Sequence, residues 1–398
     1  MKTYSQTPSL LVLLALFLSA ALVTSCQTDD TDFSQYTYTG TVSESNSDDD
    51  DSDDTAIVTA DTISIAWNGS SVTVTGDERG CVTTSGADVI VNDTSTTIAL
   101  TLVLSGSTGD GSLLVYRQKK YTMQLNGVDI TNPDGSAINN QCSKSLYLVC
   151  ADGTENVLTD GTSYTSQAYQ QKGAFFSEGQ TYFSGGGTLT ANGNYKNAIA
   201  CDDYITILSG ITINANTSET GTNGIKVNDG MFIEGGTLNI SVASEGGRGI
   251  NCDARTVISG GTTTITTSGD CLVETINNVT DTTSAAGIKS DSLFTMTGGE
   301  LTITSTGDGG KGIRCNENVE ISGGTLVVRT TGGNDYGKPK GIKSDTGIII
   351  SGGSMTVNVK KSWALDNGSE SETPADRITV KGSPATVSIA KKSVLITY

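Results

Sequence analysis

The sequence predicts an all-β protein, a right-handed, single-stranded parallel β-helix with coils of about 25 residues. Three observations predict it. Glycine is abundant, at 48 residues, while proline is scarce, at 5. Two short motifs recur in alternation along the second half of the chain. No stretch beyond residue 25 has the 3.6-residue apolar period of an amphipathic helix.

The first motif is an apolar residue followed by a polar residue, two glycines and a strand, as in Ile233–Leu238 (IEGGTL). Further copies are Ile258–Thr262, Met296–Glu300, Ile321–Thr325 and Ile350–Ser354. The spacing from Gly235 to Gly260 is 25 residues, and the next spacings are 38, 25 and 29. The base period is therefore 25, with insertions near residues 272–286 and 332–340.

The second motif has the form Gly-Ile-Lys-Ser-Asp. Its copies are Gly224–Asn228, Gly249–Asp253, Gly287–Asp291, Gly312–Asn316 and Gly341–Asp345, with an earlier variant at Ala198–Asp202. Each unit thus holds three short strands separated by turns of Gly, Asn and Asp. One unit forms one coil, coils stack about 4.8 Å apart, and the handedness rule for parallel connections makes the helix right-handed.

The chain ends differ from this repeat. Residues 1–25 are predicted to be a secretory signal, because Lys2 precedes an apolar run at Leu10–Leu18 that is too short to span a membrane. Val23–Cys26 resembles a bacterial lipobox, which predicts lipidation of Cys26; an ordinary signal peptide with an incidental cysteine is the alternative. Residues 26–61 hold eleven acidic and no basic side chains, which predicts a disordered tether.

Residues 62–398 form the predicted β-helix domain, with irregular coils up to about residue 195 and a C-terminal cap at 363–398, where Lys391 and Lys392 protect an open edge. Cys26–Asp30 resembles the acidic export signal of surface lipoproteins in Bacteroidota. An outer-membrane lipoprotein that faces the cell surface, attached to the membrane through Cys26, is therefore expected.

Composition excludes several functions. The chain has no histidine, which excludes Ser-His-Asp and Cys-His nucleophiles and histidine-bound zinc. Without Lys2 and the tether acids, the remainder has 23 basic and 32 acidic residues, a net charge of −9. No basic stripe is present, so nucleic acid is not an expected partner. A monomer is expected.

Successive side chains of a strand point to opposite sides. In the second motif, the third residue of each copy therefore points into solvent, and stacking of the coils aligns these residues in one column. The basic members and one amide of this column are Lys226, Asn251, Lys289, Arg314 and Lys343. A second column, two residues further along each strand, is Asp202, Asn228, Asp253, Asp291, Asn316 and Asp345. The alternating inward position holds Cys201, Cys252 and Cys315, which lie two or more coils apart, too far for disulfides.

These columns suggest two binding functions. Carboxylate and amide oxygens are the ligands that calcium prefers, so Asp203 and the acidic column are candidate calcium ligands. The basic residues Lys226, Lys289, Arg314 and Lys343 suit the carboxylates of acidic sugars, and Tyr195 and Tyr204, near the same turns, could pack on sugar rings. Alternatively, the two columns neutralise each other across coils, and Asp and Asn only shape turns.

The two motifs, together with Leu146–Asp160 (LYLVCADGTENVLTD), resemble a family of carbohydrate-binding β-helix proteins typified by a clostridial cellulose- and acid-sugar-binding protein. The resemblance covers about residues 60–398. It implies a right-handed parallel β-helix, bound calcium, and binding of cellulose-like or uronic-acid polymers. It also implies a structural likeness to pectate lyases without established lyase activity.

The sequence therefore predicts non-catalytic, calcium-assisted polysaccharide binding at the cell surface. One alternative is a calcium-dependent polysaccharide lyase that uses Lys226, Lys289 or Lys343 as the base. The other is a structural adhesin, in which both columns are only solvated faces.

Overall fold

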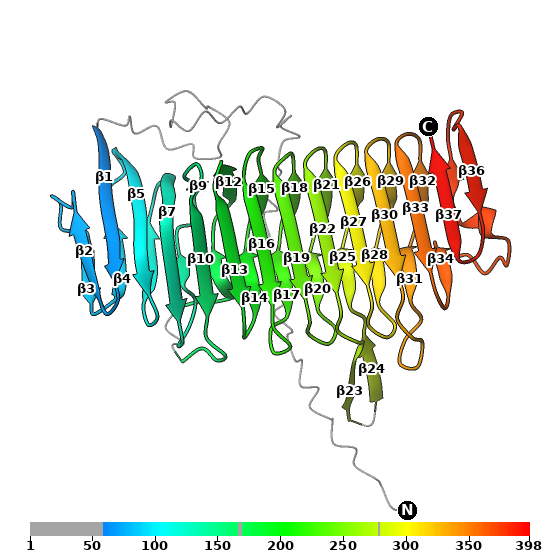
Figure 1. The fold of residues 1–398 in the computed structure, drawn as a ribbon, viewed down its shortest axis with the longest axis horizontal. Coiled ribbons are helices and arrows are strands. Elements are labelled where there is room, and N and C mark those ends of the chain that lie inside the picture. The colour runs from blue at the N-terminus through cyan, green and yellow to red at the C-terminus, as the bar shows by residue number, and fades with distance from the viewer. Residues whose placement is uncertain (1–58, 166–168, 278) are drawn as a thin grey trace, which may run out of the picture. The chain divides into compact units, whose positions relative to one another are not determined.

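The computed structural model describes residues 59–165, 169–277 and 279–398 (Figure 1). The predicted signal peptide, Cys26 and almost all of the predicted tether lie outside these residues. The first strand begins at Thr59, so the last residues assigned to the tether belong to the folded domain. No helix among the described residues is long and apolar enough to cross a membrane.

The predicted parallel β-helix is confirmed. Each complete coil contributes one strand to each of three faces, and strands of successive coils pair in parallel (Figure 1). We call the first the charged face. Its strands are β3 (Val82–Ser85), β4 (Asp88–Asp93), β6 (Ser112–Arg117), β8 (Ile138–Asn140), β11 (Gly173–Ser177), β14 (Asn197–Cys201), β17 (Asn223–Val227), β20 (Arg248–Cys252), β25 (Ala286–Ser290), β28 (Lys311–Cys315), β31 (Lys340–Ser344) and β34 (Trp363–Asp366).

The second is the threonine face, named after its outward side chains. Its strands are β10 (Glu155–Asp160), β13 (Thr188–Gly193), β16 (Thr212–Thr217), β19 (Thr237–Val242), β22 (Thr262–Thr267), β27 (Glu300–Ser305), β30 (Thr325–Thr330) and β33 (Ser354–Val359). The third face consists of β9 (Leu146–Cys150), β12 (Thr181–Gly185), β15 (Tyr204–Ile207), β18 (Gly230–Ile233), β21 (Arg255–Ile258), β26 (Phe294–Met296), β29 (Val319–Ile321) and β32 (Ile348–Ile350).

The core is a stack of identical apolar positions. On the charged face, the isoleucine of each second motif pairs with the isoleucine of the next coil, and all are at most 1% exposed: Ile199, Ile225, Ile250, Ile288, Ile313 and Ile342. The residue before each isoleucine is glycine in five coils. A Cβ there would collide with the threonine face's inward side chains, such as Ile303 opposite Gly287. The motif is therefore fixed by packing.

The cysteine column is also confirmed. Cys201 pairs with Val227 and Val227 with Cys252, so these cysteines lie two coils apart. None of the seven described cysteines forms a disulfide.

The N-terminal coils are less regular, as predicted, because three long strands each run along two faces: β1 (Thr59–Asn68), β5 (Ile98–Thr108) and β7 (Tyr121–Asn132). Gly106, at φ +79°, marks the irregularity between β5 and β7. Strand β2 (Ser71–Thr75) pairs antiparallel with β1 at this end.

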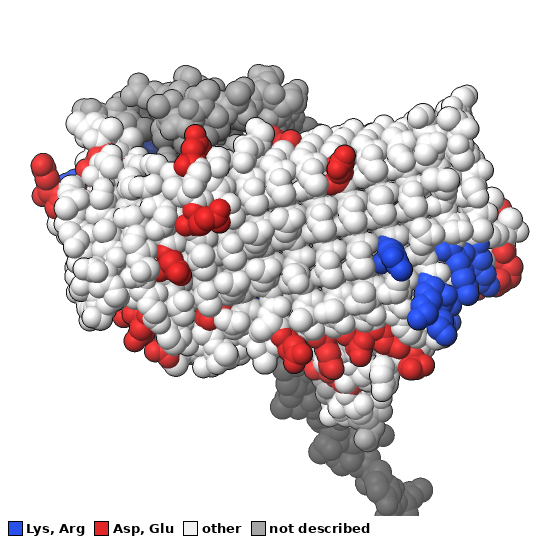
Figure 2. Space-filling model, viewed as in Figure 1, with Lys and Arg blue, Asp and Glu red and all other residues white. Residues whose placement is uncertain are grey.

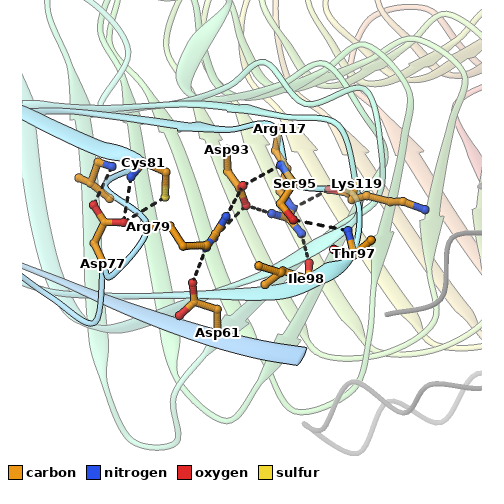
Figure 3. A network of polar contacts seen from close by, with 11 residues as sticks. Asp61, Asp77, Arg79, Cys81, Asp93, Ser95, Thr97, Ile98, Arg117 and Lys119 are labelled. Atoms are coloured by element: carbon orange, nitrogen blue, oxygen red, sulfur yellow. Dashed lines mark hydrogen bonds and ion pairs between the residues drawn. The ribbon is translucent and has the colours of Figure 1, made fainter. Parts of the chain in front are cut away.

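An ion-pair network lies behind this first hairpin (Figure 3). Asp93 is 2% exposed and is held by both Arg79 and Arg117, and Arg79 also contacts Asp61 at 2.9 Å. Burial alone would raise the pKa of the Asp93 carboxyl group. The contacts with the two arginines favour the carboxylate and outweigh burial, so the pKa of Asp93 is lowered.

At the other end, β35 (Thr379–Val380), β36 (Thr386–Ile389), β37 (Ser393–Thr397) and the 3₁₀ turn η2 (Pro374–Arg377) form the predicted cap. Strand β37 pairs antiparallel with β33. The carbonyls of Lys391 and Lys392 accept hydrogen bonds from Ala364 and Val359. The lysine pair therefore covers the last edge through its backbone.

Candidate functional site

The predicted basic column exists on the charged face. Parallel register aligns Ala200, Lys226, Asn251, Lys289, Arg314, Lys343 and Asp366. The threonine face, by contrast, carries few charged side chains in the view of Figure 2. Charge is therefore concentrated by face, as the alternation of the second motif predicts.

Three lysines of this column form ion pairs with the acidic column. Lys226 pairs with Asp253 of the next coil, whereas Lys289 and Lys343 pair with Asp291 and Asp345 of their own coils, at 2.5 and 2.6 Å. Mutual neutralisation, the alternative weighed from the sequence, thus accounts for these six side chains. Each pair is partly exposed, so its contribution to stability is small.

The remaining acidic-column residues also contact protein groups. The Asp202 carboxylate accepts a hydrogen bond from Lys172 at 2.6 Å and one from the Asn228 amide at 3.2 Å. Asn316 donates to Asp291 at 3.0 Å, and Asp203 accepts a hydrogen bond from the backbone N–H of Tyr204.

Calcium needs six to eight converging oxygens. Among the described residues, no group of three or more acidic, histidine or cysteine side chains could hold a metal ion. The carboxylates point to ammonium and amide donors instead, so this arrangement does not fit a calcium site as it stands.

A second column, most of whose members are buried, was missed by the sequence analysis. It lies at the residue before each motif glycine and comprises Asn197, Asn223, Arg248, Ala286, Lys311, Lys340 and Trp363. Three of its members are basic. Lys340 pairs with Asp366 at 2.7 Å, but Arg248 and Lys311 have no carboxylate partner among the described residues.

Arg248, Lys311 and Arg314 form a cluster of cations without a direct ion pair among the described residues, although the charges of Asp291 and Asp253 act on Arg248 from further away. Burial lowers the pKa of Arg248, and the charge of Arg314 lowers it further. Burial also lowers the pKa of Lys311 to about 8, and Arg314 again adds to the effect. The Nε atoms of both arginines are buried and lack a hydrogen-bond acceptor in the described part of the chain. We call these three side chains the cation cluster.

Two loops border the cluster on the side where the charged strands begin. The hairpin of β23 (Leu272–Ile276) and β24 (Val279–Thr283) projects from the solenoid just before β25 (Figure 1). Ser284, which follows the hairpin, accepts a hydrogen bond from the Lys311 ammonium. In the next insertion, Asp308 accepts hydrogen bonds from the backbone of Asp335 and Tyr336. These are the two insertions that the uneven repeat spacing predicts.

The N-terminal part of the charged face is covered. Phe176 and Ala200, which precede Lys226 in the basic column, are 0% exposed. The segment before β11 lies over them: Lys172 lies 5.4 Å from the Phe176 ring, and the Gln171 carbonyl accepts a hydrogen bond from Lys196. The accessible charged surface therefore begins near Lys226.

The two predicted aromatic residues lie apart. Tyr195 is 40% exposed, precedes β14 and packs edge-on against Tyr164, with ring centroids 5.0 Å apart. Tyr204 begins β15 on the third face and packs near Phe232 at 5.9 Å. The structure therefore brings Tyr195, but not Tyr204, to an edge of the charged face.

Comparison with known proteins gives this arrangement a family. A family model described as "Carbohydrate-binding domain-containing protein" matches residues 85–253 and 241–335, more than half of the chain. The chain belongs to this carbohydrate-binding domain family. The matched residues include Arg248, Lys311 and Arg314.

A family relative from Acetivibrio thermocellus, with the same description, is 32% identical over 117 residues, which are 28% of this chain and 41% of the relative. The chain thus matches less than half the length of that relative. A solved structure of a polysaccharide lyase-like protein from C. thermocellum, a gadolinium derivative, superposes with a TM-score of 0.51 and 22% identity over 65% of this chain and 96% of that one. At this identity the likeness shows the fold alone.

Proposed function

We propose that this member of the carbohydrate-binding domain family binds polysaccharide along the charged face, from Lys226 towards Lys343, and favours acidic glycans. The observation that carries the proposal is the cation cluster, since partly exposed cations without a direct carboxylate partner attract anionic groups. Family membership supports a polysaccharide ligand. Lys226, Lys289, Arg314 and Lys343 of the basic column are all partly exposed.

The test is isothermal titration of the mature chain with polygalacturonate and with soluble cellulose oligosaccharides, with calcium and again with chelator. Binding to polygalacturonate is expected. Calcium assistance stays a prediction: loss of binding in chelator would support it, and unchanged binding would remove calcium from the proposal. Absence of binding to every acidic and neutral glycan tested would refute the function and favour a structural adhesin.

A lyase is the second candidate, and Lys311 is the observation that favours it. Lys226, Lys289 and Lys343, the bases considered from the sequence, have their ammonium groups held by carboxylates. Lys311 has no such partner, and its pKa of about 8 leaves a fraction of neutral amine.

In the elimination, the Lys311 amine would take the proton α to a uronate carboxylate. The released electron pair would form the ring double bond, the C4–O bond would break, and the leaving oxygen would take a proton from water. An ultraviolet-absorbing unsaturated product should then appear, and Lys311→Met should abolish it. A flat absorbance over hours would leave non-catalytic binding as the function.

The cellular location is a further proposal. Lipidation at Cys26 would attach the protein to the outer membrane and present the glycan-binding domain at the cell surface. Metabolic labelling with a fatty acid analogue should label the natural chain and not Cys26→Ser. Protease treatment of intact cells would then distinguish a surface location from a periplasmic one.

A further inference from the structure

The corner at which the threonine face turns into the charged face changes sign along the solenoid. The turns before β17, β20, β25, β28 and β31 each hold an acid, and of these turns only the last also holds a lysine. These acids are Glu219, Glu245, Asp270, Asp308 and Asp335. The next turn, before β34, is Lys360-Lys361-Ser362. In Figure 2, acidic side chains line the lower edge of the threonine face and cations gather at its C-terminal end. A polyanion on the charged face therefore meets repulsion along this corner except at the last coil.

The two lysines belong to a larger group of cations. Parallel register places Arg329 of β30 beside Asn358 of β33, and Asn358 lies beside Ser393 of β37. Neighbouring strands are about 4.8 Å apart, and Lys360 follows Asn358 by two residues, about 7 Å along the same outward side. Lys392 directly precedes Ser393. Four exposed cations thus share this corner, and we call them the corner patch: Arg329, Lys360, Lys361 and Lys392.

The cap does not use the side chains of the corner patch. The Lys392 carbonyl accepts a hydrogen bond from the backbone N–H of Val359 at 2.8 Å, so the backbone closes the edge. The neighbouring Lys391 pairs with Glu372 at 3.1 Å. By contrast, no corner-patch cation forms an ion pair with a described residue. On a domain with a net charge of −9, exposed cations without such partners attract an external anion.

The charged face directs a polyanion towards this corner. Asp366 follows Lys343 in the basic column, so a carboxylate ends the column. Asp345 lies on the side where the strands end. On the other side, β34 begins at Trp363, two residues after Lys361 and about 7 Å from it. The corner patch is therefore the continuation of the basic column that does not lead past an acid.

We propose that the corner patch extends the polysaccharide-binding surface of the charged face. A polyuronate chain that lies along the basic column crosses the corner at the last coil, and its next carboxylates pair with the corner patch. Asn358 and Ser393, between the cations, hydrogen-bond hydroxyl groups of the same chain. This inference rests on the proposed function and adds a requirement for chain length. Short uronates occupy the charged face alone, whereas long ones also reach the corner patch.

The test titrates the full mature chain with trigalacturonate and with long oligogalacturonates. Lys226 and Lys343 lie four coils apart, about 19 Å, so the trimer fits on the charged face. The variant Lys360→Gln/Lys361→Gln should bind the long oligomers roughly fivefold more weakly and the trimer with unchanged affinity. The matched control Lys119→Gln/Lys120→Gln removes two consecutive lysines at the other end and should change neither affinity. Circular dichroism checks that both variants fold.

The other outcomes overturn the corner patch as a glycan contact. Unchanged affinity of Lys360→Gln/Lys361→Gln for long oligomers would show that the polymer does not cross this corner. Equal losses for the trimer and the long oligomers, or equal losses in the control, would show a diffuse charge effect. Vesicles of phosphatidylglycerol and phosphatidylcholine test a lipid surface instead. Cosedimentation that the variant loses, while it keeps its affinity for long oligomers, would assign the corner patch to lipid.

Failure of the proposed function gives a different pattern. If the charged face is not the site, Arg314→Gln/Lys343→Gln should bind long oligomers as tightly as the natural chain does. A loss confined to Lys360→Gln/Lys361→Gln would then support the corner patch as a glycan contact without the charged face. Absence of binding to both lengths of oligomer would overturn the two proposals together.

Discussion

The glycine column inside the solenoid can be tested by adding one methyl group. A Cβ on Gly287 would lie 2.3 Å from Cγ2 of Ile303 and 2.8 Å from the carbonyl oxygen of Gly312. Ile303 is fully buried, so it cannot move aside into solvent. Overpacking of this kind costs about 1–3 kcal/mol. Gly287→Ala should therefore lower the free energy of unfolding by that amount.

The same contact predicts how a second substitution behaves. Ile303→Ala alone leaves a cavity and should cost about 2–5 kcal/mol. In the double variant the new Cβ enters space that Ile303 has vacated. The combined cost should therefore be smaller than the sum of the single costs, by about 0.5–3 kcal/mol, as for other residues in contact.

Urea unfolding followed by circular dichroism measures these differences, provided the slope with urea stays constant. Gly109→Ala is the control, because nothing lies within 4 Å of a Cβ at that position, and its effect should stay within about 0.5 kcal/mol. An unfolding midpoint for Gly287→Ala equal to that of the natural chain would refute the packing argument. Strict additivity in the double variant would refute it as well.

Three further predictions concern ionisable groups. The pKa of Lys311 falls on folding, from 10.5 to about 8. Between these pH values the unfolded chain binds more protons than the folded chain, so the free energy of unfolding should rise with pH from about 8 to 10.5. Urea midpoints should show this rise for the natural chain and not for Lys311→Met. Burial raises the pKa of Asp160 from 3.8 to about 6, although the hydrogen bond from Tyr164 acts to lower it. The folded chain therefore binds more protons than the unfolded chain between these values, so the free energy of unfolding should fall as the pH rises from 3.8 to 6. Asp160→Asn should remove most of this fall. Burial raises the pKa of Cys315 to about 11, so a thiol reagent at neutral pH should label Cys315 only as fast as the chain unfolds; rapid labelling of the native protein would contradict its burial.

Period and alternation were sufficient to predict the fold and one column of the candidate site. A 25-residue repeat corresponds to one coil of the β-helix. The alternation of side chains along each strand then determines which of them point outward. Lys226, Lys289, Arg314 and Lys343 were placed correctly in this way. The cysteine column followed from the same rule.

The cation cluster was harder to predict, for identifiable reasons. Arg248, Ala286 and Lys311 occupy one column but share no residue type, so no motif marks the position. Extending each expected strand by one residue before its glycine would have found it. The ion-pair partners could not be predicted either, because Lys226 pairs with an aspartate of the next coil while Lys289 pairs with one of its own coil. That choice depends on side-chain rotamers, which repeat spacing does not determine.

The hairpin of β23 and β24 lengthens one coil without disturbing its neighbours, since Cys252 still pairs with Ser290 on the far side of the insertion. Length can therefore be gained or lost at this turn while the stacked strands stay in register. A lineage carrying this solenoid could exchange such loops one at a time, each exchange altering the wall beside the charged surface and leaving folding intact. Ligand range and structural stability would then evolve as nearly independent traits, with the turns as the variable part and the coils as the constant one.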